Sequence, residues 1–323
     1  MLKFLAAYRR LVWLVLAEAF GVLLLVAFVV GLATMPPLGA RPNPKSPLHF
    51  SLTVDGAAWW ANFNRYGQML LHGSLGVDRE GYRVAPMLTT FLAHSLLLLG
   101  LATLIAIALG VCKGFYDFQS MHKRRVALAP LITGAISGLP DFWLVLMLQV
   151  MAAWLWRTLD FNAFKVSYDP TQPAASLVYP VIALSLIPLS QVARVTSTAM
   201  GNVFGQDYIR TARAKGLQEL IVVYKHALRN ALVQILDSLP GVLVAMLSNL
   251  LVVEYLFSYP GLTQLLLKAS RTAVDRTGAM QGMDAPVLIA AGISLGLIFS
   301  LFYLMIRFLR TVVDPRLRGR RAS

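Results

Sequence analysis

The chain reads Gln206-Asp-Tyr-Ile-Arg-Thr-Ala-Arg-Ala-Lys-Gly216, and a second polar run, Lys225-His-Ala-Leu-Arg-Asn-Ala231, follows shortly after it. The stretch is strongly cationic, with basic residues at Arg210, Arg213, Lys215, Lys225 and Arg229. Its second half predicts a helix with one apolar face, formed by Leu217, Leu220, Ile221, Tyr224 and Leu228. Gly216 interrupts the pattern where a turn between two short helices is expected. Because long apolar segments flank the stretch, we expect a folded basic surface held between two membrane spans.

The composition indicates a membrane protein. Of the 323 residues, 57% are hydrophobic and only 14% are charged, which does not suit a soluble chain. The single cysteine, Cys112, excludes an intrachain disulfide and a multi-cysteine metal site. The net charge of +14 lies in short segments beside apolar spans, where Lys and Arg set membrane topology. We therefore expect contact with membrane lipid and no binding of nucleic acid.

Six apolar segments are long enough to cross about 30 Å of hydrocarbon as helices. They are Leu11–Ala33, Met87–Val111, Val126–Trp154, Leu177–Val195, Ala231–Leu256 and Ala285–Leu309. The first resembles a signal peptide because Lys3, Arg9 and Arg10 precede it. However, it is longer than a signal core and lacks a small-residue cleavage site, so we interpret it as a retained helix.

The distribution of basic residues predicts the orientation. Nineteen of the 29 Lys and Arg residues fall in the N-terminus, the segments 112–125 and 194–230, and the C-terminal tail, all on one side of the predicted membrane. The positive-inside rule places this side in the cytoplasm. We therefore expect a multi-pass protein of the cell (inner or cytoplasmic) membrane with both termini in the cytoplasm.

The predicted organisation has four parts. Residues 1–33 form an N-terminal transmembrane helix, and 34–86 form an extracytoplasmic loop with an interfacial helix. Residues 87–311 form a core of five transmembrane helices that includes the polar loop 200–230, and 312–323 form a basic cytoplasmic tail. The interfacial helix is predicted from an aromatic face made of Trp59, Phe63, Tyr66 and Leu70. A surface for stacking a sugar or a peptide is the alternative for these residues.

Motifs of catalytic chemistry are absent from the sequence. It has no G-x-x-x-x-G-K-[ST] phosphate loop, so we expect no ATP hydrolysis by this chain. It has no H-E-x-x-H or paired-cysteine motif for zinc and no G-x-S-x-G nucleophile elbow. We therefore expect neither an enzyme nor a metal or cofactor held by the chain itself.

The stretch from Gln206 to Ala231 resembles the cytoplasmic loop of permeases in binding-protein-dependent ABC importers, most closely the oligopeptide/dipeptide/nickel branch. That branch reads much like D-Y-[VI]-R-T-A-R-A-K-G-L followed by H-A-L-R-N-A-L. Shorter fragments agree at the expected places: Gly73-Ser-Leu-Gly76, Gly138-Leu-Pro-Asp-Phe-Trp143, Tyr179-Pro-Val-Ile-Ala-Leu184, Val253-Glu-Tyr-Leu-Phe-Ser-Tyr-Pro-Gly261 and Asp314-Pro-Arg316. The outer segments after the first span and at 268–284 depart from the family pattern.

The resemblance implies an all-α polytopic fold with six transmembrane helices and cytoplasmic coupling helices, as in type I ABC importer permeases. It implies a pathway for a small solute, peptide first, with nickel or another small solute as alternatives. The implied partners are a second homologous permease, two cytoplasmic ATPase subunits or domains that bind ATP and Mg, and an extracytoplasmic solute-binding protein. The implied ATPase-coupling residues are Asp207, Tyr208, Arg210, Thr211, Ala212, Arg213, Lys215, Gly216, His226 and Arg229. For the same basic loop, attraction to anionic lipid is the alternative.

Polar residues at membrane depth are candidates for the translocation pathway because their burial in lipid is costly. The candidates are Asp141, Gln149, Asn249 and Glu254. Asp141 is predicted near the middle of the third span, where Pro140 frees a backbone carbonyl. Its alternative role is to cap a helix break or to pair with Arg194 or a partner subunit. For Gln149 the alternative is a hydrogen bond between helices.

A second functional hypothesis remains open at the level of sequence. The chain could be a non-transporting membrane scaffold or sensor component whose basic loop docks another cytoplasmic protein. Co-purification distinguishes the two, because a transporter subunit brings down a nucleotide-binding ATPase and a scaffold does not.

Overall fold

The computed structural model describes residues 39–43, 46–53, 56–122, 128–160, 163–215, 228–271, 273–274, 280–281 and 283–313, together with Phe20, Gly21, Leu24, Phe28 and Gly31. Most of the predicted first span, the predicted turn at Gly216 and almost all of the basic tail therefore lie outside the described residues.

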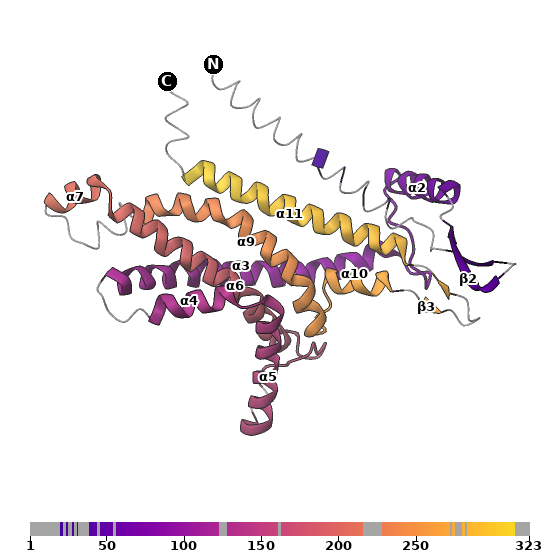
Figure 1. Cartoon of the computed structure of the whole chain (residues 1–323), viewed down its shortest axis with the longest axis horizontal. Coiled ribbons are helices and arrows are strands. Elements are labelled where there is room, and N and C mark those ends of the chain that lie inside the picture. Colours follow the sequence, from indigo (N-terminus) through magenta and orange to yellow (C-terminus); the bar gives the residue numbers. More distant parts are fainter. Residues whose placement is uncertain are drawn as a thin grey trace, which may run out of the picture. The chain divides into compact units, whose positions relative to one another are not determined.

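The described chain is dominated by helices, so the predicted all-α class is confirmed (Figure 1). The helices are α2 (Gly56–Leu71), α3 (Val84–His122), α4 (Leu128–Gly138), α5 (Asp141–Leu159), α6 (Pro173–Phe204), α7 (Asp207–Ala214), α9 (Arg229–Leu256), α10 (Leu262–Ser270) and α11 (Ala285–Val313). Two short antiparallel hairpins join strands β1 (Gly39–Asn43) and β2 (Ser46–Thr53), and strands β3 (Ala273–Val274) and β4 (Met280–Gln281). Both hairpins lie in segments that the sequence predicts as loops.

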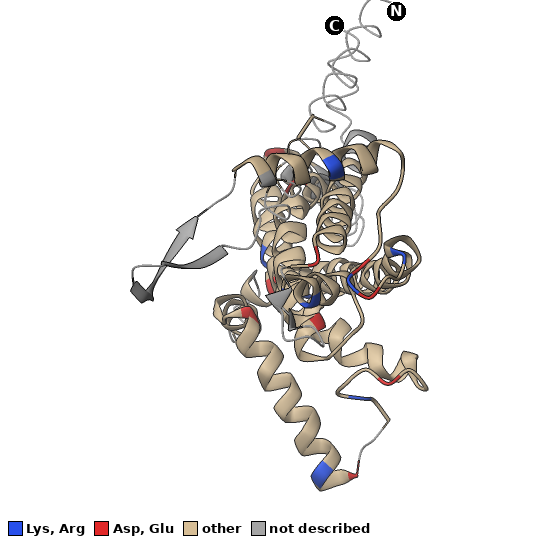
Figure 2. Cartoon of the chain, turned by 90° about the vertical axis from the view of Figure 1, so that its right-hand side faces the viewer, with Lys and Arg blue, Asp and Glu red and all other residues tan. Residues whose placement is uncertain are grey.

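Five helices in the described part of the chain are long and apolar enough to cross a membrane. They comprise Val84–Met121, Asp141–Leu159, Pro173–Phe204, Ala231–Leu256 and Ala285–Ile306. In Figure 2 most of the described chain is tan, and Lys, Arg, Asp and Glu colour only a few places on its helices. The sixth predicted span, Leu11–Ala33, falls largely outside the described residues, so the count of six stays a prediction.

The predicted third span, Val126–Trp154, is wrong as a single helix. The structure divides it into the short helix α4 and the membrane-length helix α5. The break is at Leu139 and Pro140, where Pro140 adopts an extended conformation with φ −61° and ψ 135°. Proline also disfavours helical geometry in the residue before it, so α4 ends before Leu139 and α5 begins after Pro140.

The chain divides into two compact units. The first comprises Met1–Ser95 and Pro260–Ser300, and the second comprises Leu96–Tyr259 and Leu301–Ser323. In the first unit, the buried Ser95 hydroxyl accepts the backbone N–H of Leu262 at 2.7 Å. Because Leu262 is the first residue of α10, this bond satisfies one of the free N–H groups at the start of that helix.

Helix α6 organises the second unit. It packs along α9 and also contacts α4 and α5 (Figure 1). Helix α3 approaches α6 closely at Gly110 and Gly114. A Cβ atom at Gly114 would lie 2.3 Å from the carbonyl oxygen of Ala193, and one at Gly110 would lie 2.8 Å from the Val192 side chain. Glycine is therefore required at both positions for this helix crossing.

Candidate coupling site

Helix α7 follows α6 after a two-residue turn at Gly205 and Gln206. The N–H of Gln206 donates to the carbonyl of Val203 at 3.1 Å, and the N–H of Ile209 donates to the carbonyl of Gln206 at 3.1 Å. Asp207 lies in the first turn of α7, where a carboxylate favours the positive end of the helix dipole. These contacts start a short helix at the beginning of the basic loop, as the sequence predicts.

One side of α7 is anchored by Ile209. Its side chain is 0% exposed and belongs to a buried group that we call the core cluster. The core cluster consists of Phe118, Ala199, Met200, Val203, Ile209 and Ala231, with Phe115, Phe204 and Leu228 packed against it. The rings of Phe118 and Phe204 are 4.8 Å apart between centroids. Residues of α3, α6 and α9 therefore hold the start of α7 through a single isoleucine.

The opposite side of α7 is open to solvent. The side chain of Tyr208 is 40% exposed, and Asp207, Thr211 and Lys215 are also exposed. The Thr211 hydroxyl donates to the carbonyl of Asp207 at 3.0 Å, which holds this hydroxyl against its own helix. Helix α7 and the residue after it thus expose an acid, a phenol and an ammonium group, while Ile209 fixes the helix to the core cluster.

The remaining predicted coupling residues are described only in part. The backbones of Arg210, Ala212 and Arg213 lie in α7, and that of Arg229 begins α9, but their side chains are outside the described residues. Gly216 and His226 also lie outside the described residues. Their roles stay predictions. The described helix ends at Ala214, just before the glycine predicted to interrupt it.

The structure places two of the candidate pathway residues on α5. Asp141 is the first residue of this helix and not the middle of a span, because Pro140 breaks the predicted third span just before it. No ion pair joins Asp141 to Arg194, both of which the structure describes. The Gln149 amide donates to the carbonyl of Leu256 at 2.6 Å, at the end of α9. The structure therefore gives Gln149 the interhelical bond that the sequence offered as its alternative role.

The other two candidate pathway residues are buried in the second unit. The side chain of Asn249 is 4% exposed and that of Glu254 is 0% exposed, and both belong to α9. The Asn249 amide oxygen has no hydrogen-bond partner among the described residues. Lining of the pathway stays a prediction for both.

A tight turn follows α9 and buries two large side chains. Phe257 and Tyr259 are each 1% exposed, and Ser258 between them has φ 50°. The N–H of Tyr168 donates to the Phe257 carbonyl at 3.1 Å, and the Tyr168 and Tyr259 rings meet edge to face at 5.5 Å. Burial raises the pKa of the Tyr259 phenol above its ordinary value, and nearby Tyr168 adds to the effect.

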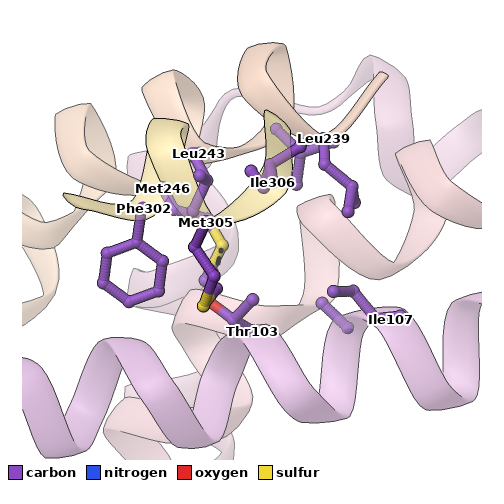
Figure 3. Close-up of a pocket in the computed structure, with 10 residues that line it drawn as sticks. Thr103, Ile107, Leu239, Leu243, Met246, Phe302, Met305 and Ile306 are labelled. Carbon is purple, nitrogen blue, oxygen red and sulfur yellow. Dashed lines mark hydrogen bonds between the residues drawn. The ribbon is translucent and has the colours of Figure 1, made fainter. Parts of the chain in front are cut away.

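A small cavity lies between α3, α9 and α11 within the second unit (Figure 3). Its volume is about 50 Å³, and its walls are almost entirely apolar. The lining includes Thr103, Leu243, Met246, Phe302 and Met305. Thr103 directs its hydroxyl to the Met246 sulfur at 3.6 Å, so even this polar group is engaged. The cavity is too small and too apolar to hold a polar solute, and we interpret it as an imperfection of packing.

Sequence reasoning missed a buried charged group near the core cluster. The sequence predicts a loop over 112–125 that includes Lys113, whereas α3 continues as a helix to His122. Lys113 and Asp117 form an ion pair in α3, and Thr133 of α4 bonds to both. The i, i+4 spacing of a lysine and an aspartate was the signal available in the sequence.

Comparison with known proteins identifies the family. The model of the family described as "Binding-protein-dependent transport system inner membrane component" matches residues 106–319, well over half of the chain. The chain is 27% identical over 312 residues to the dipeptide transport system permease protein DppB of Escherichia coli (strain K12), covering 88% of each. It is 30% identical over 239 residues to a putative peptide transport system permease protein of Brucella abortus (strain 2308), covering 73% of this chain and 71% of the relative.

A solved structure supports the fold. The inward-facing methionine ABC transporter MetNI contains a chain that matches with a TM-score of 0.54 and 14% sequence identity. The match covers 71% of this chain and 96% of that one. At this identity the likeness shows the fold alone, but it agrees with the family match. The chain belongs to the inner membrane components of binding-protein-dependent transport systems and is a permease subunit of an ABC importer.

Proposed function

We propose that this permease subunit forms, together with a second homologous permease, the pathway for a small peptide. Two cytoplasmic ATPase subunits or domains drive the transport, and an extracytoplasmic solute-binding protein delivers the peptide. The relatives support this substrate class because their names specify dipeptide and peptide transport. Nickel or another small solute is the alternative that a transport assay has to test.

The geometry of α7 is the observation that carries the proposed coupling. Ile209 fixes the helix to a core cluster built from α3, α6 and α9, while Tyr208 and Lys215 remain exposed. A surface helix fixed to several long helices transmits a push on its exposed side to all of them, in the way that alternating access requires. Attraction of a basic loop to lipid alone does not require this apolar anchor.

ATP and Mg belong to the partner subunits in this proposal. The sequence offers no phosphate loop, and the curated relatives are named as transport permeases. In the proposed orientation, α7 and both termini lie on the cytoplasmic side of the membrane. An ATPase partner also distinguishes the permease from the scaffold, which has no such partner. Family membership does not favour the scaffold hypothesis.

Cross-linking tests the contact of α7 with the ATPase. In a Cys112→Ser background, a cysteine at Tyr208 should form a cross-link to the ATPase in native membranes. A cysteine at Tyr82, which is also an exposed tyrosine but lies in the segment between α2 and α3 in the first unit, is the matched control. Cross-linking of both positions, or of neither, contradicts the proposed contact.

Uptake into proteoliposomes tests the substrate. The complete complex, with its binding protein and ATP, should accumulate radiolabelled dialanine, and unlabelled dialanine should compete. Nickel uptake without dialanine uptake would replace the peptide by the metal ion as the solute. ATP hydrolysis without uptake of any solute would contradict the proposed transport function.

A further inference from the structure

Helix α3 carries two different contacts at the end that approaches α7. Phe118 belongs to the core cluster that holds Ile209, and its ring lies 4.8 Å from that of Phe204. Its neighbour Asp117 points to α4 instead, as does Lys113 one turn earlier. A short segment of α3 therefore touches both the base of the coupling helix and the helix α4.

The contact with α4 is a closed polar triangle. The Lys113 ammonium donates to the Asp117 carboxylate and to the Thr133 hydroxyl at 2.9 Å. The Thr133 hydroxyl in turn donates to the other carboxylate oxygen of Asp117 at 2.6 Å. Lys113 also donates to the carbonyl of Ala129 at 3.0 Å, one turn earlier in α4. We call Lys113, Asp117 and Thr133 the polar triangle.

Because the polar triangle is largely buried, its contribution to stability alone does not explain why charged residues occupy these positions. Asp117 is 2% exposed and Thr133 is 5% exposed, whereas the Lys113 side chain is 30% exposed. Withdrawing a carboxylate from water has a large cost, and the attraction of its partner often only balances that cost. Replacing a buried ion pair by apolar residues of similar volume is often neutral or even stabilising. What the charges add is direction, because the bonds fix both the register and the rotation of α4 on α3.

The other end of α4 is tied to α6. The Ser137 hydroxyl donates to that of Ser190 at 2.8 Å, and the Ser190 hydroxyl donates to the carbonyl of Ile187 at 2.7 Å. Beyond Ser137, α4 ends at Gly138 and the Pro140 break leads into α5. Helix α4 is thus a short rod with polar attachments at both ends, placed between the segment of α3 beside the core cluster and the start of a membrane-spanning helix.

We propose that Lys113, Asp117 and Thr133 are positioning residues of transport, which make α4 follow the segment of α3 that holds the coupling helix. This inference rests on the proposed function of α7. A displacement of α7 moves Phe118 through Ile209, the polar triangle carries the displacement into α4, and the Pro140 break delivers it to α5. The polar triangle acts through the position of α4 and touches neither solute nor nucleotide.

Conservative substitutions at Thr133 test the inference in the complete complex in proteoliposomes. Thr133→Val removes the hydroxyl and keeps the shape, whereas Thr133→Ser keeps the hydroxyl. The measured quantity is dialanine transported per ATP hydrolysed, because a purely structural role changes the amount of active complex and leaves this ratio unchanged. We expect Thr133→Val to lower the ratio about three- to tenfold and Thr133→Ser to keep it near wild type. Thr158→Val is the matched control, since among the described residues the Thr158 hydroxyl bonds only to the carbonyl of Trp154 in its own helix.

The double variant Lys113→Met/Asp117→Leu separates positioning from stability. An apolar pair should fold at least as stably as the ion pair, and we expect its ratio to be lowered like that of Thr133→Val. A wild-type ratio in Thr133→Val or in the double variant overturns the inference and leaves the proposed function intact. A wild-type complex that hydrolyses ATP but moves no solute overturns the proposed function, and the inference with it.

Discussion

The backbone N–H of Arg79 donates to the Asp284 carboxylate at 3.0 Å, although 205 positions separate the two residues. The Arg79 guanidinium also donates to the carbonyls of Ala269 and Arg271, at 3.1 and 2.9 Å. Asp284 itself lies directly before α11 and reaches the N–H of Val287 at 3.5 Å. A single arginine therefore holds the segment between α2 and α3 against the segment between α10 and α11, within the first unit.

Replacing Arg79 by alanine should destabilise this unit. The substitution leaves two carbonyls without their donor, which costs about 1–3 kcal/mol for a partly buried site. Thermal unfolding of the purified protein in detergent measures the effect. Arg83→Ala is the control because Arg83 is exposed. Equal losses in the two variants would show that the two carbonyls are satisfied by other groups.

The glycines of α3 and α4 should respond differently to alanine. Gly114→Ala brings a methyl group to 2.3 Å from the Ala193 carbonyl, so α3 and α6 have to separate. In contrast, a Cβ atom at Gly134 meets nothing within 4 Å among the described residues. Gly134→Ala should therefore be neutral or stabilise the helix by about 0.5–1 kcal/mol, while Gly114→Ala lowers the yield of folded protein. Fluorescence-detected size-exclusion chromatography of both variants makes the comparison.

The sequence predicts the spans well because apolar length alone identifies a membrane helix. The predicted Ala231–Leu256 coincides with the membrane-length part of α9, and Ala285–Leu309 lies within α11. The prediction fails for the end of α3, because polar residues follow the apolar segment without ending the helix. Helix α3 extends to His122, well beyond the predicted end at Val111. Lys113 and Asp117 look like loop residues by composition, but they neutralise each other inside the helix. Only the packing of α4 against them creates that site.

The sequence alone also does not show which pair of glycines lies at a helix crossing. Both Gly134-Ala-Ile-Ser-Gly138 and Gly110-Val-Cys-Lys-Gly114 have the spacing that lets helices approach closely. The first pair attracts attention because its neighbours are small, yet the second is the one that meets α6. Which face of α3 turns toward α6 is decided by the whole set of contacts. For the coupling loop, the predicted turn at Gly216 implies a short helix before it, and α7 lies there, but the sequence does not identify Ile209 as its anchor. The helix that the apolar periodicity predicts after Gly216 lies almost entirely outside the described residues.

Alkaline pH should weaken the fold through Tyr259. Its buried phenol has a raised pKa, so the folded protein keeps a proton that the unfolded chain releases above about pH 10. The stabilising contribution is complete below that pH and is lost as the pH rises further. We expect the melting temperature of the wild type to fall more steeply between roughly pH 10 and 12 than that of Tyr259→Phe. Tyr82→Phe, at an exposed tyrosine, should follow the wild-type curve.

The anchor of α7 gives the most direct test of how structure and transport are joined. Ile209 is fully buried in the core cluster, so Ile209→Ala should weaken the attachment of α7 by about 2–5 kcal/mol. The substitution leaves the exposed side chains of α7 unchanged, and Ile209 lies outside the membrane-length helices. We therefore expect normal membrane insertion and faster hydrogen exchange of the amides in 208–215. Dialanine uptake should fall even though the ATPase still binds.

Ile132→Ala is the matched control for this variant, because Ile132 is an exposed isoleucine of α4. It should change neither the exchange of the 208–215 amides nor uptake. If the amides of α7 stay protected in Ile209→Ala, the helix is held by contacts other than this side chain. If they lose protection while uptake per ATP hydrolysed is unchanged, a rigid attachment of α7 is not needed for transport. The coupling would then have to pass through the part of the loop beyond Lys215.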